Sequence, residues 1–100
     1  MHTINNSEND VNAYEYILEL YVTKNSSSSI RAIKNIQLIK EQYLKEKTKI
    51  EVIDIYENPE KLFENGIVSI PTLIRKKPLP EIRIIGDLSN EQEVIKLLII

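Results

Sequence analysis

Few residues of this 100-residue chain have side chains that could perform nucleophilic, acid–base or metal chemistry. The chain contains no cysteine, which excludes a disulfide, a thiolate nucleophile, an iron–sulfur cluster and a cysteine-ligated zinc site. His2 is the single histidine and lies in a polar N-terminal segment, so an imidazole base or a multi-histidine metal site is not expected. The carboxylates show no paired spacing suited to acid–base catalysis. We therefore expect no catalytic residue, no metal and no cofactor.

Phosphate-binding motifs are also missing from the sequence. Gly66 and Gly86 are the two glycines, so neither a glycine-rich dinucleotide motif nor a P-loop can form. The serine run 26–29 could hold an anion at the start of a helix, but serine at such a place is more often a helix cap. Asp87 directly follows Gly86, and this pair is typical of a turn.

The side chains with most potential for recognition are Arg75 and Arg83, which lie on one predicted hairpin. Arg75 opens the run Arg75-Lys76-Lys77-Pro78-Leu79-Pro80, which predicts a basic hairpin turn stiffened by proline. Together with Arg83, this hairpin could meet carboxylates of a partner through bidentate contacts. The alternative is a solvated hairpin whose charges discourage edge-to-edge pairing of strands.

Composition indicates one small globular domain without a strong global charge. The chain is 42% hydrophobic with a net charge of −2, so it has neither the composition of a disordered protein nor a basic excess that would attract nucleic acid. No apolar run approaches the ~18 residues of a membrane span, and the polar N-terminus is unlike a signal peptide. We expect a cytoplasmic protein with a flexible lead-in over 1–13, one domain over 14–100, and neither nucleic acid nor membrane as partner.

The first half of the domain predicts two strands joined by a helix. Residues 16–22 and 50–55 alternate with a period of two, whereas residues 30–46 repeat apolar side chains at helical spacing. Strand, helix and strand in this order predict a parallel pair with a right-handed crossover. Both faces of the first strand are largely apolar, so this strand should be central in the sheet.

The second half predicts two more helices around a hairpin. Asn58 suits the cap of a short helix that starts at Pro59 and ends before Gly66 at its C′ position. A capping box that begins at Ser89 predicts a last helical segment over 90–100.

Pro71 marks the start of the hairpin, because proline cannot donate within a strand ladder. Residues 72–75 and 81–85 form its two strands. The full order, βαβαββα, matches a single thioredoxin-like α/β domain. In that fold the proline at this place is usually cis, whereas only about 5–6% of X–Pro bonds are cis in general, so the spacing leaves both isomers open. Serines occupy the place of the redox cysteines, and serine cannot perform thiol–disulfide exchange.

Several segments of the chain resemble the KaiB family of small clock proteins, from about Tyr16 onward. The stretch Ile84-Ile85-Gly86-Asp87-Leu88-Ser89 is the specific one. The weaker segments are Tyr16-Ile17-Leu18, Leu20-Tyr21-Val22, Asn25, Ser29, Arg31-Ala32, Val52-Ile53-Asp54, Asn58-Pro59, Pro71-Thr72-Leu73, Pro78-Leu79-Pro80 and Arg83.

The resemblance implies a non-enzymatic module that can switch between two folds. KaiB-like proteins bind the N-terminal ring of KaiC, a hexameric ATPase and autokinase, help to sequester KaiA, and compete with the histidine kinase SasA. A tetrameric ground state, βαββααβ, exchanges with a monomeric thioredoxin-like state that binds KaiC, which requires two packings within a few kcal/mol. The implied function is to modulate the phosphorylation or output of a KaiC-type ATPase, with a dimer or tetramer in the free state. The alternative is a paralogue that serves as a stress-response or signalling adaptor similar to the SasA sensor domain.

The resemblance also implies a set of partner-binding residues. Arg31, Arg75 and Arg83 match basic family positions associated with KaiC binding, and we expect all three to be exposed. At the family's partner-binding surface, Glu51 replaces a lysine used at the KaiC surface, and Ile82 replaces the first of two paired arginines.

Five residues are expected to decide between the two folds, namely Pro71, Gly86, Asp87, Leu97 and Ile99. Leu97 replaces a family glycine, which removes a helix penalty of about 1 kcal/mol. Ile99 replaces an aspartate, and its β-branched side chain favours a strand instead. A helix would place Leu97 with Val94 on one apolar face. The capping box favours this helix, and with it the thioredoxin-like fold, over a state with 95–100 extended and 78–90 helical.

Overall fold

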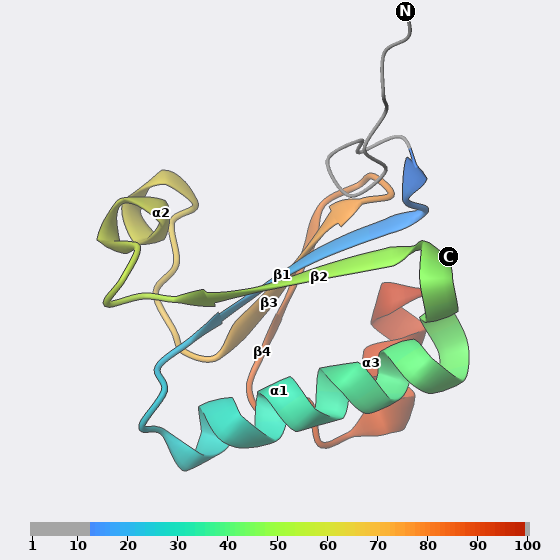
Figure 1. The fold of residues 1–100 in the computed structure, drawn as a ribbon, viewed down its shortest axis with the longest axis horizontal. Coiled ribbons are helices and arrows are strands. Elements are labelled where there is room, and N and C mark those ends of the chain that lie inside the picture. Colours follow the sequence, from blue (N-terminus) through green and yellow to red (C-terminus); the bar gives the residue numbers. More distant parts are fainter. Residues whose placement is uncertain (1–12, 100) are drawn as a thin grey trace, which may run out of the picture.

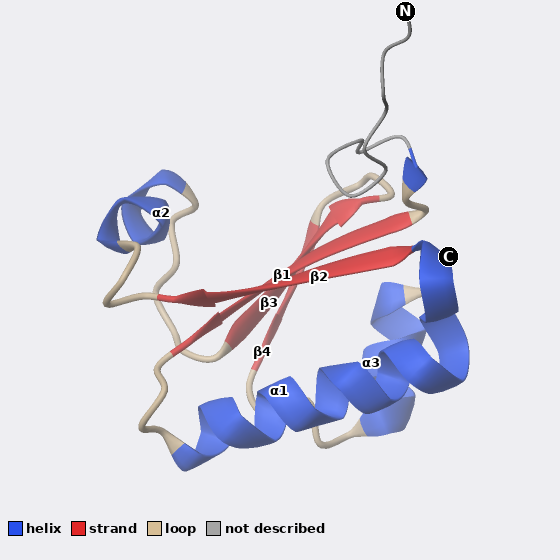
Figure 2. Cartoon of the chain, viewed as in Figure 1, coloured by secondary structure: helices blue, strands red, loops and turns tan. Residues whose placement is uncertain are grey.

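The computed structural model describes residues 13–99, apart from the side chain of Glu46. His2, Ile100 and all but the last residue of the predicted lead-in lie outside the described residues. The elements are β1 (Tyr16–Val22), α1 (Ser27–Ile39), a π-helical turn η2 (Lys40–Leu44), a 3₁₀ turn η3 (Lys45–Lys47), β2 (Thr48–Asp54), α2 (Pro59–Glu64), β3 (Thr72–Lys77), β4 (Ile82–Ile85) and α3 (Glu91–Leu98). The predicted order βαβαββα is confirmed (Figure 2).

The four strands form one mixed sheet in the order β2-β1-β3-β4. β1 is parallel to β2, while β3 is antiparallel to both β1 and β4. The predicted parallel pair and the central place of β1 are therefore confirmed. β1, β2 and β4 end, and β3 begins, at the same end of the sheet, where α2 and the first turn of α1 also lie (Figure 1). We call this the α2 end.

The helices cover the two faces of the sheet unequally (Figure 1). α1 and α3 pack on one face over the larger core, whose buried residues are Leu18, Leu20, Val22, Ala32, Ile36, Ile39, Leu44, Leu73, Leu88, Val94 and Leu98. α2 lies on the opposite face over a smaller cluster made of Tyr21, Ile53, Ile67 and Ile74. Within residues 13–99, no helix has the length and apolar character needed to cross a membrane.

The serine run acts as the N-cap of α1. The Ser26 hydroxyl accepts the backbone N–H of Ser29 at 3.2 Å, which satisfies one of the free donors at the helix start. Ser29 is itself buried, and its hydroxyl accepts the N–H of Thr23 at 3.1 Å. The helix therefore begins at Ser27, three residues before the predicted start, and its turns continue through Lys47.

The start of α2 differs from the prediction at its cap. Pro59 is the first helical residue as expected, but the Asn58 side chain does not cap the helix. It donates instead to the Asp54 carbonyl at 3.1 Å. The Asp54 carboxylate accepts the N–H of Tyr56 at 2.8 Å, so an aspartate turn leads from β2 into the helix.

The end of α2 is the predicted glycine stop. Gly66 has φ +60°, the left-handed conformation that glycine adopts most easily. Its N–H bonds to the Phe63 carbonyl at 3.2 Å, and the N–H of Ile67 bonds to the Leu62 carbonyl at 3.0 Å. These two bonds form a Schellman motif, which satisfies carbonyls that the helix leaves unpaired.

Pro71 directly precedes β3, as predicted, and the Ile70–Pro71 peptide bond is cis. The Pro71 carbonyl accepts the N–H of Gly86 at 3.0 Å, which continues the β3–β4 ladder by one pair. β3 extends to Lys77, two residues beyond the predicted strand.

α3 is a helix, and the alternative with an extended end and a helical hairpin region is not observed. Its cap is Asn90, whose side chain accepts the N–H of Glu93 at 3.2 Å, so the predicted cap at Ser89 is wrong by one residue. The helix ends at Leu98, and Ile99 is extended. Val94 and Leu98 are buried on one face of the helix as predicted, whereas Leu97, predicted on the same face, is 45% exposed.

A candidate protein-interaction surface

Arg31 lies in the first two turns of α1 and holds the turn that follows β4. Its Nε donates to the Asp87 carboxylate at 2.9 Å, and Asn35 Nδ2 donates to the Asp87 carbonyl at 2.9 Å. The other carboxylate oxygen accepts the N–H of Ser89 at 3.0 Å. The hydrogen bond from Arg31, followed by those from Ser89, lowers the pKa of Asp87. Asp87 is thus a turn residue, as predicted, that also ties this turn to α1.

Arg75 is buried, so its expected exposure is wrong. The residue is 2% exposed, with Nη1 2.7 Å from the Leu98 carbonyl and Nη2 2.8 Å from the Pro80 carbonyl. The guanidinium satisfies the last carbonyls of α3, where a cation is also favoured by the helix dipole. Strand alternation carries the signal for this burial, because Arg75 lies on the same face of β3 as buried Leu73 and pairs with Leu18.

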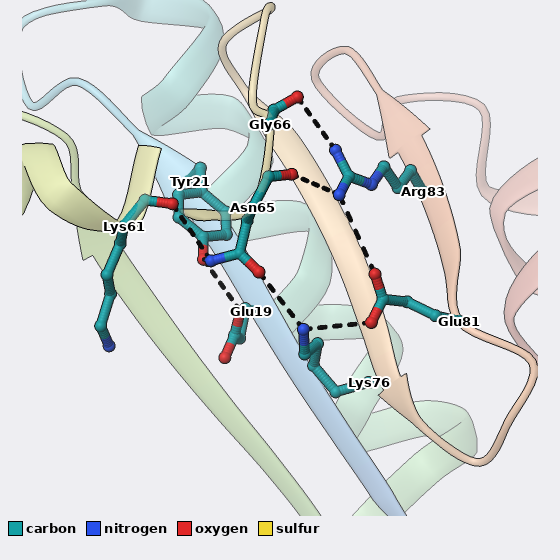
Figure 3. Close-up of polar contacts among 8 residues, drawn as sticks. All are labelled: Glu19, Tyr21, Lys61, Asn65, Gly66, Lys76, Glu81 and Arg83. Atoms are coloured by element: carbon teal, nitrogen blue, oxygen red, sulfur yellow. Dashed lines mark hydrogen bonds and ion pairs between the residues drawn. The ribbon is translucent and has the colours of Figure 1, made fainter. Parts of the chain in front are cut away.

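Arg83 occupies the opposite face of the hairpin and binds the end of α2. Its Nη1 donates to the Gly66 carbonyl at 3.2 Å, and its Nη2 donates to the Asn65 carbonyl (Figure 3). The side chain remains 39% exposed, and its Nη2 lies 3.9 Å from the Glu81 carboxylate. Arg83 is therefore accessible to a partner while it stabilises the turn after α2.

The three predicted arginines do not form one cationic surface. Arg31 lies on the α1 side of the sheet, Arg75 lies beneath the end of α3, and Arg83 lies on the α2 side. Each guanidinium has an intramolecular partner. The basic hairpin expected from the sequence is divided between the two faces of the sheet.

A polar network connects α2 to the sheet (Figure 3). Asn65 Nδ2 donates to the Tyr21 hydroxyl at 2.9 Å, and this hydroxyl donates to Glu19 at 2.9 Å. Lys76 Nζ lies 3.3 Å from the Asn65 side-chain oxygen and 3.0 Å from Glu81. Burial, followed by the hydrogen bond to Glu19, raises the pKa of Tyr21, so its hydroxyl stays protonated. The network fixes the position of α2 at its end of the sheet.

The α2 end also presents large apolar side chains that the sequence analysis did not single out. Each is at least 56% exposed: Ile30, Tyr56, Phe63, Val68 and Ile85. They belong to the first turn of α1, the turn after β2, α2 itself, the loop before β3 and the last position of β4. Exposed apolar groups gathered at one end of a small domain are typical of a docking site. We call these five residues the apolar set.

The α2 end carries no redox or metal chemistry among the described residues. The start of α1, where thioredoxins place their cysteines, holds the cap residue Ser26 and the first-turn residue Ser29, both used as hydrogen-bond acceptors for backbone N–H groups. No group of histidine or acidic side chains suited to a metal ion is found within residues 13–99. The α2 end therefore presents the exposed apolar set, with charged side chains around it, as a surface for binding a partner.

Comparison with known proteins places the chain among its relatives. The KaiB domain matches residues 19–100. The chain belongs to the KaiB family. A circadian clock oscillator protein KaiB from Thermostichus vulcanus is 42% identical over 80 residues, which cover 80% of this chain and 74% of the relative. Circadian clock protein KaiB3 from Synechocystis sp. is 43% identical over 79% of this chain and 78% of its own length.

Solved structures show that this KaiB-family chain has a thioredoxin-like fold. Mitochondrial thioredoxin 3 from Saccharomyces cerevisiae is similar with a TM-score of 0.70 and 16% identity, over 88% of this chain and 80% of the thioredoxin. The N-terminal domain of Synechococcus elongatus SasA is similar with a TM-score of 0.60 and 22% identity, over 85% of this chain and 81% of that domain. At these identities the likeness concerns the fold alone.

Proposed function

We propose that this KaiB-family chain is a non-enzymatic module that binds a KaiC-type hexameric ATPase and autokinase and modulates its phosphorylation or output. The relatives at 42–43% identity are circadian clock proteins, which supports a clock role. The absence of cysteine from the sequence and the serines at the thioredoxin redox position argue against reductase chemistry.

The observation that carries the proposal is the apolar set at the α2 end. Phe63 is 83% exposed and Val68 is 90% exposed, and neither side chain belongs to the core of the domain. Interfaces typically combine such an apolar centre with a charged rim. Arg31 supplies one rim cation, because it lies next to Ile30 in α1 and its side chain remains 55% exposed.

The predicted partner-binding residues enter this proposal with different roles. Arg31 and Arg83 remain candidates for direct contact, since both side chains are accessible. Arg75 is assigned a structural role because it is buried. Glu51 replaces a family lysine, so this position carries a negative charge where the family carries a positive one. Its carboxylate pairs with Lys61 of α2 at 3.4 Å.

The proposal is tested by titrating the chain into the purified KaiC-type ATPase from the same genome. We expect Phe63→Ser combined with Val68→Ser to weaken binding at least about tenfold, because the few residues at the centre of an interface that carry most of its energy contribute more than about 1 kcal/mol each. Leu79→Ser is the matched control, since Leu79 is 76% exposed at the opposite end of the sheet and should leave binding unchanged. Full affinity of the Phe63/Val68 variant would exclude the apolar set, and no binding by the unchanged chain would exclude the ATPase as partner.

A second candidate function is a stress-response or signalling adaptor. The SasA N-terminal domain, a structural neighbour of this chain, supports this candidate. An adaptor of this kind would act on a SasA-like histidine kinase, or on a KaiA-like protein, and would not need the ATPase. Kinase autophosphorylation measured with and without the chain distinguishes the two functions, because only the adaptor would alter it when no ATPase is present.

A further inference from the structure

The turn that ends α2 contains the one asparagine of the sequence that is followed by glycine, Asn65–Gly66. Such a pair can deamidate without an enzyme, because glycine has no side chain that would hinder attack of its backbone nitrogen on the preceding side-chain amide. Both residues also hold the α2 end together. Asn65 binds the Tyr21 hydroxyl, and Gly66 forms part of the Schellman motif. A chemically reactive pair therefore lies at a position that the structure depends on.

We propose that Asn65–Gly66 is a site of spontaneous deamidation whose rate is set by local opening of α2. The Gly66 backbone nitrogen loses its proton and attacks Cγ of Asn65, so that an N–C bond forms and ammonia leaves. The product is a succinimide ring, which water then opens. Addition of water at Cγ gives aspartate, and addition at the main-chain carbonyl gives isoaspartate. The net reaction consumes one water, releases one ammonia and involves no oxidation or reduction.

The folded structure keeps both reacting groups from this reaction (Figure 3). The Gly66 N–H donates to the Phe63 carbonyl at 3.2 Å, so its proton is not accessible to base. Asn65 Nδ2 donates to the Tyr21 hydroxyl at 2.9 Å and to the Lys61 carbonyl at 3.1 Å, which fixes the side-chain amide. Cyclisation therefore requires that the end of α2 opens and these hydrogen bonds break.

Hydrogen exchange and deamidation at this turn start from the same atom. Both need base to remove the Gly66 amide proton, and both are blocked while this N–H is bonded to Phe63. When opening and closing are fast compared with the chemical step, the rate of that step follows the population of the open form. The factor by which folding slows deamidation should therefore equal the protection factor of the Gly66 amide.

Each product weakens the contacts that hold the end of α2. An ionised carboxylate has no N–H to donate, so aspartate at this position loses the bonds that Asn65 donates to Tyr21 and Lys61. Isoaspartate also adds one methylene to the main chain before Gly66, which is incompatible with the spacing of the Schellman bonds. The modified chain should therefore populate the open form of α2 more than the unmodified chain.

The modified turn lies between two residues of the apolar set. Phe63 precedes it in α2, and Val68 follows it in the loop before β3. Deamidation would therefore change the surface to which we assign partner binding, and this consequence rests on the proposed function. The reaction itself involves only the chain and water, so its test needs no partner.

The rate is measured on the full chain, incubated at mildly alkaline pH in the native state and in urea, by peptide mapping with mass spectrometry. Native-state exchange observed by NMR gives the protection factor of the Gly66 amide. We expect the ratio of the two deamidation rates to match this protection factor within about threefold. Asn65→Gln is the chemical control, because glutamine forms the corresponding ring far more slowly and should show no conversion.

Tyr21→Phe tests the control by α2 independently. Loss of one hydrogen bond to Asn65 should raise both the exchange of Gly66 and the deamidation rate about fivefold. Tyr43→Phe makes the same chemical change at a 44% exposed position in η2 and should alter neither rate. The comparison of native and urea-unfolded states uses the unchanged chain, so it stands even if Tyr21→Phe does not fold.

Three results would overturn the proposal. The first is no conversion at Asn65 in the urea-unfolded chain. The second is a native deamidation rate that departs from the rate set by Gly66 protection by more than about tenfold in either direction. The third is a purified deamidated chain whose α2 amides are as protected as those of the fresh chain.

Discussion

At the scale of single residues, Arg75 and Arg83 perform the same task on opposite faces of one hairpin. Arg75 binds the carbonyl of Leu98 at the end of α3, and Arg83 binds those of Asn65 and Gly66 after α2. Free carbonyls at helix ends are among the groups that a folded chain has to satisfy. Arg75 is buried whereas Arg83 is exposed. The hydrogen bonds of Arg75 should therefore contribute more to the free energy of unfolding than those of Arg83.

Substitution of Arg75 should therefore destabilise the domain strongly. We expect Arg75→Met to lower the free energy of unfolding by about 3 kcal/mol, because the buried carbonyl of Leu98 and the partly buried hydrogen bond to Pro80 lose a charged donor. Arg83→Met should cost about 1 kcal/mol or less, since water can replace the more exposed guanidinium. Urea denaturation of the two variants measures both values. Equal losses would contradict the structural role assigned to Arg75.

The titration of Asp87 should make the free energy of unfolding depend on pH in the acidic range. Its folded-state pKa lies below its ordinary value of 3.8, so the unfolded chain takes up a proton first as the pH falls. The stabilisation from Asp87 is thus present above pH 3.8 and is lost as the pH falls through the folded-state pKa. Asp87→Asn should be less stable than the unchanged chain at neutral pH, with a gap that narrows below pH 3.8. A gap that stays constant down to pH 2 would show that Asp87 does not titrate in this way.

Residues with a strong local rule were predictable from the sequence, whereas those decided by tertiary contacts were not. Gly66 and Pro71 take their predicted places because a helix stop and a strand start follow from backbone chemistry alone. The lysines and prolines that follow Arg75 are typical of an exposed turn, so the sequence predicts an exposed side chain there. Strand alternation puts Arg75 on the same face as buried Leu73, but the carbonyls that accept its guanidinium, more than twenty residues away at the end of α3, follow only from the tertiary structure. The apolar set was missed because exposure depends on what the fold leaves uncovered.

At the scale of elements, the caps show how local signals compete. Ser89 and Asn90 are adjacent and are both good N-cap residues. The N–H of Ser89 is taken by the Asp87 carboxylate in the preceding turn, and Asn90 becomes the cap of α3. A similar competition moves Asn58 away from its predicted capping role, because Asp54 offers its carbonyl. The existence of each helix was predictable, and its exact first residue depended on the preceding turn.

The capping assignment of α3 can be measured with a pair of adjacent variants. Asn90→Ala should lower the free energy of unfolding by about 1 kcal/mol, because the N–H of Glu93 loses its acceptor. Ser89→Ala should cost less than Asn90→Ala, because the backbone N–H of Ser89 keeps its bond to Asp87 and only the contact of an exposed hydroxyl with Asp87 is lost. Thermal or urea denaturation provides the measurement. A larger loss for Ser89→Ala than for Asn90→Ala would restore the cap predicted from the sequence.

At the scale of the whole molecule, the element order was predictable and the choice between two folds was the open question. Periodicity and turn residues give βαβαββα, but an apolar end such as 95–100 is compatible with either a helix or a strand. The structure shows a helix that ends at Leu98 and is held by Arg75 and the Asn90 cap. Leu97 is 45% exposed. Leucine in place of the family glycine therefore stabilises the helix by its higher helix propensity more than by packing in the core.

The unequal layers of the molecule predict unequal local stability. α2 has every residue at least partly exposed, and it is tied to the sheet through the packing of Leu62, the Lys61–Glu51 pair and the polar contacts of Asn65 and Arg83. β1 is central and buried under α1 and α3. Native-state hydrogen exchange should therefore show α2 amides opening locally, well below the free energy of global unfolding, while β1 amides exchange only on global unfolding.

Asn65→Ala tests the connection between α2 and the sheet. This substitution removes the hydrogen bond to the Tyr21 hydroxyl and the contact with Lys76. Since these contacts hold α2 and not the larger core, we expect the protection of α2 amides to fall about tenfold or more, which corresponds to about 1.4 kcal/mol for lost hydrogen bonds. The protection of β1 should fall only by the change in global stability. If α2 were as strongly protected as β1 in the unchanged chain, the two faces of the sheet would unfold as one unit, and the smaller layer could not open independently to adapt its apolar residues to a partner.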